Sequence, residues 1–188
     1  DLYRHCEVRD AQWARGPLTV NAGRNGGIRV EGWDGNGIQV RAVIQTRGRD
    51  EARARSLAGA VQVQANGGEV SATGTDRTDE ESWSVSYRIR VPRQNDLQLS
   101  ARNGGISVTN VTGTITFDTV NGGGQLSDLG ARVNGRTRNG GVKVALSGSQ
   151  WDGEGLDVET SNGGVTIEIP EAYNAQLETR TVNGGFRS

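Results

Sequence analysis

The sequence is poor in the residues that most catalytic and metal-binding sites use. Its 188 residues include one cysteine, one histidine and one lysine (Cys6, His5 and Lys143) and no methionine. One cysteine excludes an internal disulfide framework, and one histidine leaves little material for a Ser-His-Asp or Cys-His site. The acidic residues do not form the paired carboxylates that a glycosidase needs. We therefore expect a protein that is not an enzyme, with no catalytic residues, no cofactor and no metal centre.

Aromatic residues and long apolar runs are scarce as well. Aromatic residues make up 5% of the chain, which indicates a thin, aliphatic core. No stretch approaches the roughly 20 apolar residues of a membrane-spanning helix, so no transmembrane segment is expected. The formal net charge of −1 gives no broad attraction to nucleic acid, and we expect no nucleic-acid partner.

The start of the chain predicts its location. The sequence begins at Asp1 and contains no methionine, as cleavage of a signal peptide would leave it. We therefore expect an extracytoplasmic protein, which is secreted, periplasmic or exposed at the cell surface.

Glycine, by contrast, is abundant, with 29 copies against 3 prolines. Without a collagen-like period of three, these glycines are expected to mark turns that need a positive φ. The motif Asn-Gly-Gly begins at Asn25, Asn66, Asn103, Asn121, Asn139, Asn162 and Asn183. From Asn103 onward the copies are 18, 18, 23 and 21 residues apart, and the first two gaps, 41 and 37 residues, are about twice as long. This spacing predicts a repeating unit of about 18–20 residues.

The residues beside the motif alternate between apolar and polar, which is the period of a half-buried strand. Leu97 and Leu99 precede Asn103, and Ile106 and Val108 follow it; most other copies keep the same phase. Asn-Gly between such strands is also a strong hairpin signal, which would give an antiparallel meander or sandwich. The constant phase favours stacking of equivalent positions about 4.8 Å apart, with the asparagines in a hydrogen-bonded ladder. We therefore predict an all-β fold, a single-stranded parallel β-helix or β-solenoid with about 18–20 residues per coil.

The repeat also predicts the domain organisation. Residues 96–188 are expected to form a regular Asn-Gly-Gly solenoid, and residues 1–95 a less regular part of the same structural domain. The one good helix-forming run predicts a short helical insert near residues 49–59.

Several of these features occur together in one bacterial family. The run Ser-Val-Ser-Tyr-Arg-Ile-Arg-Val-Pro at 84–92 leads into Leu97-Gln98-Leu99 and then into the Asn-Gly-Gly units. In this respect the chain resembles the putative-adhesin family of unknown function, a relative of the head GIN auto-transporter adhesin domains. The resemblance covers nearly the whole chain, although family members more often carry Asn-Gly-Asp. It implies a β-helix attached to or exported across a bacterial membrane, and no catalytic residues.

Three groups of residues are candidates for binding. Asp34 and Asp152 lie in a second, partial repeat, Trp-Asp-Gly-x-Gly, and could offer oxygens to Ca²⁺, although simple turns are the favoured interpretation. Arg24, Arg102 and Arg138 precede three of the motifs and are the patch expected for an anionic partner. The chain ends, with Leu2, Tyr3, Cys6 and Phe186, are candidates for self-association, because the last motif starts a unit that the sequence does not complete.

Two functions follow from these candidates. The first is a structural or adhesin-like module that self-associates end to end into an extracellular filament. The alternative is a monomeric surface module that binds a glycan or another anionic polymer.

Overall fold

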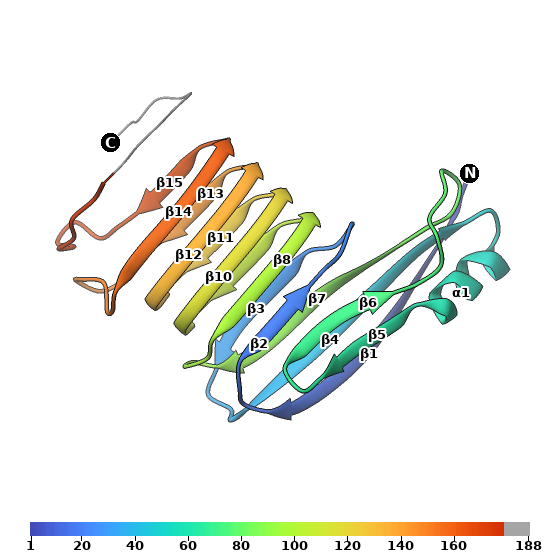
Figure 1. Cartoon of the computed structure of the whole chain (residues 1–188), viewed down its shortest axis with the longest axis horizontal. Coiled ribbons are helices and arrows are strands. Elements are labelled where there is room, and N and C mark those ends of the chain that lie inside the picture. The colour runs from blue at the N-terminus through green and yellow to red at the C-terminus, as the bar shows by residue number, and fades with distance from the viewer. Residues whose placement is uncertain (179–188) are drawn as a thin grey trace.

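The computed structural model describes residues 1–178, which form two β-sheets packed against each other and one helix (Figure 1). Sheet A has eight strands, in the order β1 (Tyr3–Ala14), β4 (Gly37–Gly48), β7 (Ser82–Pro92), β3 (Ile28–Trp33), β9 (Ile106–Thr109), β11 (Gly124–Ser127), β13 (Val142–Ala145) and β15 (Val165–Glu168). Sheet B has seven, in the order β14 (Gly155–Asn162), β12 (Gly130–Asn139), β10 (Thr112–Asn121), β8 (Leu97–Asn103), β2 (Leu18–Asn21), β6 (Glu69–Thr73) and β5 (Gln62–Asn66).

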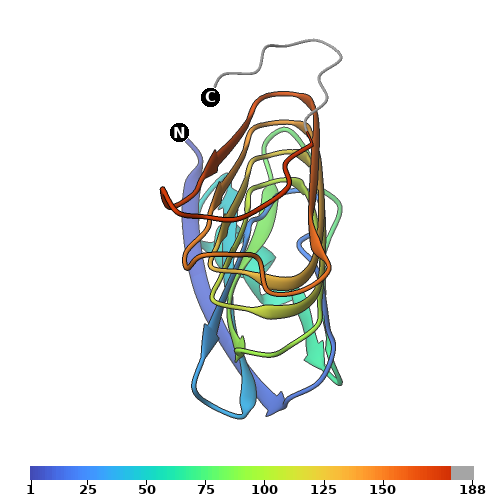
Figure 2. The same cartoon turned by 90° about the vertical axis from the view of Figure 1, so that its left-hand side faces the viewer.

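From β8 onward the chain alternates between the two sheets, and each strand pairs in parallel with its equivalent in the next repeat. The register aligns Asn103 with Asn121, Asn121 with Asn139, and Asn139 with Asn162. Seen along the stack, these repeats lie one behind another (Figure 2). The constant phase of the apolar residues is therefore the sequence signature of this parallel part.

The N-terminal Asn-Gly-Gly unit does not follow this sequential order. Strands β2 and β3, which flank Asn25, pair in parallel with β8 and β9, so that Leu18 aligns with Leu97 and Ile28 with Ile106. On their other side the same two strands pair with β6 and β7. The first unit is thus inserted between strands that come about 50 to 80 residues later in the chain.

The prediction of a single-stranded parallel β-helix or β-solenoid is wrong, although the all-β character holds. Both sheets are mixed: β1, β4 and β7 pair antiparallel in sheet A, and β5 and β6 do so in sheet B. The motif at Asn66 forms the tip of the β5–β6 hairpin, where Gly67 and Gly68 have φ values of +59° and +87°. Two adjacent residues with positive φ turn the chain back on itself. Here the hairpin alternative applies, at one of the six motifs that lie within residues 1–178.

At Asn103 and Asn121 in the parallel part, the motif needs glycine for space rather than for a positive φ. Neither glycine has a positive φ in the Asn103 and Asn121 motifs. A Cβ at Gly122 would lie 2.2 Å from the carbonyl oxygen of Gly104, and a Cβ at Gly104 would lie 2.0 Å from that of Gly26. Each first glycine therefore stacks directly on the backbone of the preceding unit, and the expectation of positive φ is wrong at these turns.

Helix α1 (Glu51–Ala60) connects β4 to β5 and packs on β1 and β4. It corresponds to the insert expected near residues 49–59. Asp50 caps its first turn by accepting a hydrogen bond from the Arg53 backbone at 2.7 Å. At the other end, the Arg9 guanidinium of β1 donates to the carbonyl oxygens of Ala58 and Val61. A cation at these carbonyls complements the helix dipole.

The core lies between the two sheets and is mainly aliphatic. Phe117, the one phenylalanine among the described residues, fills space that neighbouring repeats leave empty: a Cβ at Gly135 would lie 1.9 Å from the ring, and one at Gly124 would lie 3.1 Å from it. Thr119 and Thr137 point inward, and their hydroxyls donate to Gly104 and Gly122 carbonyl oxygens at 2.9 and 2.7 Å. Each inward threonine thus holds the turn of the preceding unit.

Candidate functional site

The asparagines of the parallel turns form one hydrogen-bonded ladder. Each side-chain amide donates to the side-chain oxygen of the asparagine in the adjacent layer, at 2.7–3.0 Å. The ladder starts at Asn25 and continues through Asn103, Asn121, Asn139 and Asn162. Asn66 lies in the hairpin and not in the ladder, and Asn183 lies outside the described residues. Because the amides bind one another, the ladder is a structural element of the turn edge.

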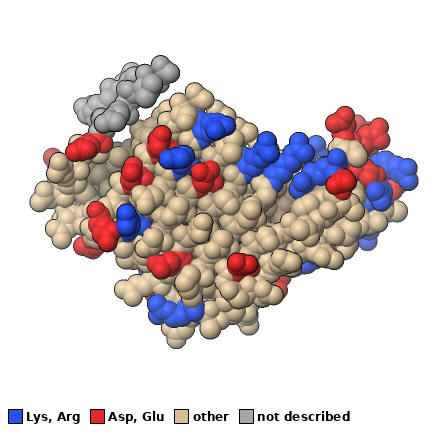
Figure 3. Space-filling view, in the orientation of Figure 1, with Lys and Arg blue, Asp and Glu red and all other residues tan. Residues whose placement is uncertain are grey.

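Basic residues follow this turn edge. Figure 3 shows Lys and Arg side chains along the edge at which β8, β10 and β12 end, and onward toward the segment before β7. Arg24, Arg102 and Arg138 are all exposed. The backbone of Asn103 donates to the Arg24 carbonyl oxygen at 3.0 Å, so Arg24 and Arg102 belong to adjacent layers. The register places Val120 between Arg102 and Arg138, so the row predicted from the sequence is interrupted.

A denser group of cations lies on the outer, solvent-facing side of sheet A. The strand registers place Arg41 of β4 opposite Arg88 of β7, and Arg88 opposite Arg29 of β3. Other arginines that face outward on β1, β4 and β7 extend this group. We call it the arginine face; it consists of Arg4, Arg29, Arg41, Arg47, Arg88 and Arg90, all of which are exposed.

The central row of the arginine face carries unneutralised charge. Arg41 binds Asp10 through two hydrogen bonds, at 2.9 and 3.3 Å. The bond to Arg41 lowers the pKa of the Asp10 carboxyl, and the same bond raises the pKa of the Arg41 guanidinium. Among the described residues, no carboxylate forms an ion pair with Arg29 or Arg88. Like charges on directly opposite residues are destabilising.

The outer face of sheet B shows the usual arrangement instead. There the register places Arg136 of β12 between Asp118 of β10 and Glu159 of β14, and Arg136 lies 3.5 Å from the Glu159 carboxylate. Opposite charges therefore alternate across these strands. On the outer face of sheet A, by contrast, Arg29 and Arg88 have no carboxylate ion-pair partner among the described residues, although the register places Glu31 of β3 opposite Arg90.

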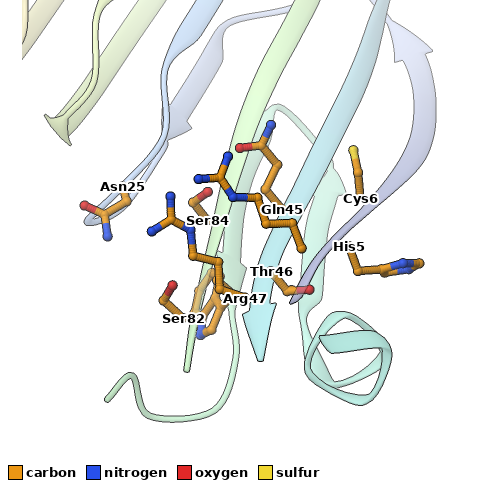
Figure 4. A pocket seen from close by; sticks show the side chains of 10 residues that line it. His5, Cys6, Asn25, Gln45, Thr46, Arg47, Ser82 and Ser84 are labelled. Atoms are coloured by element: carbon orange, nitrogen blue, oxygen red, sulfur yellow. The ribbon is translucent and has the colours of Figure 1, made fainter. Parts of the chain in front are cut away.

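An open polar hollow of about 480 Å³ lies at one end of the arginine face. In Figure 4, Arg47 extends between Asn25 and Ser84, whereas His5 points away from them. Arg4 and Gln45 also line this hollow. Its guanidinium, amide and hydroxyl groups are suited to hydrogen bonds with a charged, polar ligand.

The calcium candidates are not brought together. Asp34 is 89% exposed and accepts a hydrogen bond from Arg93 at 2.8 Å, whereas the backbone of Asp152 accepts one from Ala131. The described part of the chain contains no group of three or more His, Cys, Asp or Glu residues that could hold a metal ion. The partial Trp-Asp-Gly repeat places Trp33 and Trp151 over turns, where their indole N–H groups donate to the carbonyl oxygens of Gly37 and Ala131.

Three of the residues expected at the self-association ends, Leu2, Tyr3 and Cys6, lie on or beside β1, an edge strand of sheet A. Leu2 and Tyr3 are each 41% exposed, and Cys6 is a free, exposed thiol. His5 interacts with Glu7 at 3.1 Å. Phe186 lies outside the described residues.

Sequence reasoning missed most of the arginine face. Arg29, Arg88 and Arg90 stand at outward positions of strands that alternate clearly, so their exposure could have been predicted. Their alignment could not, because it depends on pairing between β3, β4 and β7.

No protein-family model matches this chain, and no curated protein matches its sequence. Among solved structures, it is similar to a putative cell adhesion protein from Clostridium sporogenes, with a TM-score of 0.50 and 10% identity over 87% of this chain and 100% of that one. Putative adhesins from Parabacteroides merdae and Parabacteroides distasonis match with TM-scores of 0.32 and 0.30, both at 9% identity, over 88% and 87% of this chain and 96% and 97% of theirs.

These structural similarities concern only the fold. At 10% identity the first concerns the fold alone, and the two lower TM-scores add no argument. The predicted relation to head GIN domains is not shown by these comparisons. Within residues 1–178, no helix is long and apolar enough to cross a membrane.

Proposed function

We propose that this protein is a non-enzymatic, extracytoplasmic, adhesin-like module that binds an anionic polymer on its arginine face. The observation that carries the proposal is the row Arg41–Arg88–Arg29, in which Arg29 and Arg88 lie opposite each other and form no ion pair with a carboxylate of residues 1–178. An extended polyanion would supply the missing negative charge along the row. Guanidinium groups suit this task because they bind carboxylate, sulfate-like and phosphate oxygens through two parallel hydrogen bonds.

The adhesin-like part of the proposal has separate support, and the extracytoplasmic part has a separate test. One solved structure with a similar fold is named a putative cell adhesion protein. The exposed thiol of Cys6 offers a direct test of location, because it is the only thiol in the chain. A membrane-impermeant maleimide should label the protein on intact cells of its source, and labelling only after lysis would contradict the proposal.

Binding to the arginine face can be measured with sulfated dextran, using unsulfated dextran as the neutral control. We expect binding to sulfated dextran only, and a weakening of binding as salt is raised. Arg88→Gln should lower the affinity about tenfold, which corresponds to about 1.4 kcal/mol. Arg136→Gln removes the same charge from sheet B and should change the affinity little. Equal losses in both variants, or equal binding of both dextrans, would contradict a specific role of the arginine face.

Self-association is a second candidate function, and β1 is the observation that favours it. This strand is 12 residues long, pairs only with β4 among the described strands, and leaves Val8 52% exposed. An unpaired strand edge can bind a strand of another copy. We expect a concentration-dependent mass increase in light scattering that Val8→Lys abolishes. A constant monomer mass up to millimolar concentration would exclude it.

A further inference from the structure

A second hollow, of about 410 Å³, lies at the other end of the arginine face from the open polar hollow of about 480 Å³ described above. It is lined by two tryptophans, three amide side chains, one isoleucine and one glycine: Trp13, Trp33, Gln12, Gln39, Asn36, Ile38 and Gly37. Two of the four tryptophans in the chain thus line one hollow, although aromatic residues are only 5% of the sequence. None of the described residues that line it is charged. Its composition therefore differs from that of the neighbouring arginine row.

The ring of Trp33 is held in a fixed position. Its indole N–H donates to the Gly37 carbonyl oxygen at 2.9 Å, and the ring lies so close to Gly35 that a Cβ there would be 2.3 Å from it. With its one polar group satisfied within the protein, Trp33 offers a ligand only its apolar surface. The indole N–H of Trp13 is buried and has no acceptor among the described residues, so it is not available to a ligand either.

The side-chain amides are the groups in this hollow that can form hydrogen bonds with a ligand. Gln12 of β1 and Gln39 of β4 are register partners, and Asn36 lies in the turn before β4. A side-chain amide both donates and accepts hydrogen bonds, as hydroxyl groups require. An apolar ring surface beside several uncharged amides is suited to a ligand that has one apolar face and a rim of hydroxyls. A sugar ring has this chemistry.

The hollow is continuous with the arginine face. Gln39 lies opposite Arg90 of β7 and two residues before Arg41 on β4, which is about 7 Å along the strand. Trp33 and Glu31 share the outward phase of β3 with Arg29. A polymer that lies along β4 and β7 would therefore meet the arginine row and the tryptophan hollow in succession.

We propose that the tryptophan hollow is a sugar-binding subsite and that the anionic polymer bound by this protein is an acidic polysaccharide. The inference rests on the proposed function of the arginine face and names the class of polymer. Single-stranded nucleic acid also combines charge with rings that stack, but it is usually bound by successive aromatic platforms. The outward residues of the arginine face beyond this hollow are mainly Arg, Gln and Ser, which favours the polysaccharide.

The test compares polygalacturonate, which has both sugar rings and carboxylates, with polyphosphate, which has charge alone, in buffer that contains a chelator. Trp33→Ala should weaken the binding of polygalacturonate about tenfold, the loss typical of an aromatic anchor, and leave polyphosphate binding unchanged. Arg88→Gln should weaken both. Trp151→Ala is the matched control, because Trp151 begins the other Trp-Asp-Gly repeat and does not line the hollow.

The outcomes separate the two proposals. If polyphosphate binds and Trp33→Ala leaves polygalacturonate binding unchanged, the sugar subsite is excluded and the arginine face remains. If neither polymer binds, the proposed function itself fails. Binding of oligo(dT) that is lost in Trp33→Ala would assign the hollow to nucleic acid instead. Should Trp33→Ala not fold, Trp33→Phe and the protection of tryptophan fluorescence from acrylamide by polygalacturonate provide the same readout, and absence of protection would overturn the inference.

Discussion

Arg29 and Arg88 lie directly opposite each other on the parallel strands β3 and β7, with their side chains on the outer face of sheet A. Because they repel each other in the free protein, this arrangement lowers the stability of the fold while it favours an anionic ligand. Charges that destabilise the free protein and bind a ligand of opposite charge are typical of a binding site. The same reasoning gives a stability test that needs no ligand.

Replacing Arg29 by Gln should stabilise the free protein. We expect the free energy of unfolding to rise by a few tenths of a kcal/mol at low ionic strength, because one member of a like-charged pair is removed. The gain should shrink in 1 M salt, where the repulsion is screened. Urea unfolding at both salt concentrations measures it. Arg136→Gln, which removes the ion pair with Glu159 and the cation opposite Asp118, should change stability in the opposite direction.

The asparagine ladder should contribute measurably to stability at each step. Asn121 donates to Asn103 and accepts from Asn139, both at 2.7 Å. Asn121→Ala removes both hydrogen bonds, and we expect a loss of about 1–2 kcal/mol in the free energy of unfolding. Asn134→Ala is the control, since Asn134 lies in the same part of sheet B outside the ladder. Equal effects of the two substitutions in chemical unfolding would mean that the ladder bonds do not stabilise the fold.

The close stacking of the turns predicts opposite outcomes for two Gly→Ala substitutions. At Gly122 the new methyl group would meet the backbone of Gly104, which cannot move aside as a flexible side chain can. We expect Gly122→Ala to cost about 3 kcal/mol or more, at the upper end of overpacking effects. At Gly59 in α1 nothing lies within 4 Å, so Gly59→Ala should stabilise the protein by about 0.5 kcal/mol through helix propensity. Thermal unfolding of both variants checks the pair, and a mild effect at Gly122 would contradict the stacking argument.

The local signals in the sequence could predict the strands but not their full arrangement. The alternation around Leu97 and Leu99 and the helix-forming run that becomes α1 depend on neighbouring residues, and pattern alone identifies them. The choice between a hairpin at Asn66 and a parallel turn at Asn103 depends on the sign of φ at two glycines, which the motif does not specify. The insertion of β2 and β3 between later strands depends on contacts between distant segments.

The candidate site could not be predicted from the sequence, because it also depends on pairing between strands that are far apart in the chain. Arg24, Arg102 and Arg138 were found because they precede a visible motif, whereas Arg29, Arg41 and Arg88 come from three strands with no common motif. Their alignment requires both the antiparallel pairing of β4 with β7 and the parallel pairing of β7 with β3. A sequence pattern of alternating strands predicts which residues face outward and leaves open which of them are neighbours.

Tyr87 in the centre of β7 predicts how stability changes at alkaline pH. Its side chain is 1% exposed, its hydroxyl is buried without a partner among the described residues, and burial raises the pKa of Tyr87 from the usual 10.0 to about 12. Between these two values the unfolded chain loses the phenolic proton and the folded protein keeps it. Stability from this group is therefore complete below pH 10 and is lost as pH rises toward 12, at up to about 1.4 kcal/mol per pH unit.

Tyr87→Phe isolates this effect, since phenylalanine has no proton to lose. At pH 7 we expect the variant to be as stable as the parent protein or about 1 kcal/mol more stable, because an unpaired buried hydroxyl is removed. Between pH 10 and 12 the parent protein should lose stability faster than Tyr87→Phe, so that the difference between their unfolding free energies grows with pH. Tyr3→Phe is the control, because Tyr3 is 41% exposed, and it should follow the parent curve. Parallel curves for Tyr87→Phe and the parent would show that the Tyr87 hydroxyl ionises equally well in the folded and unfolded chains.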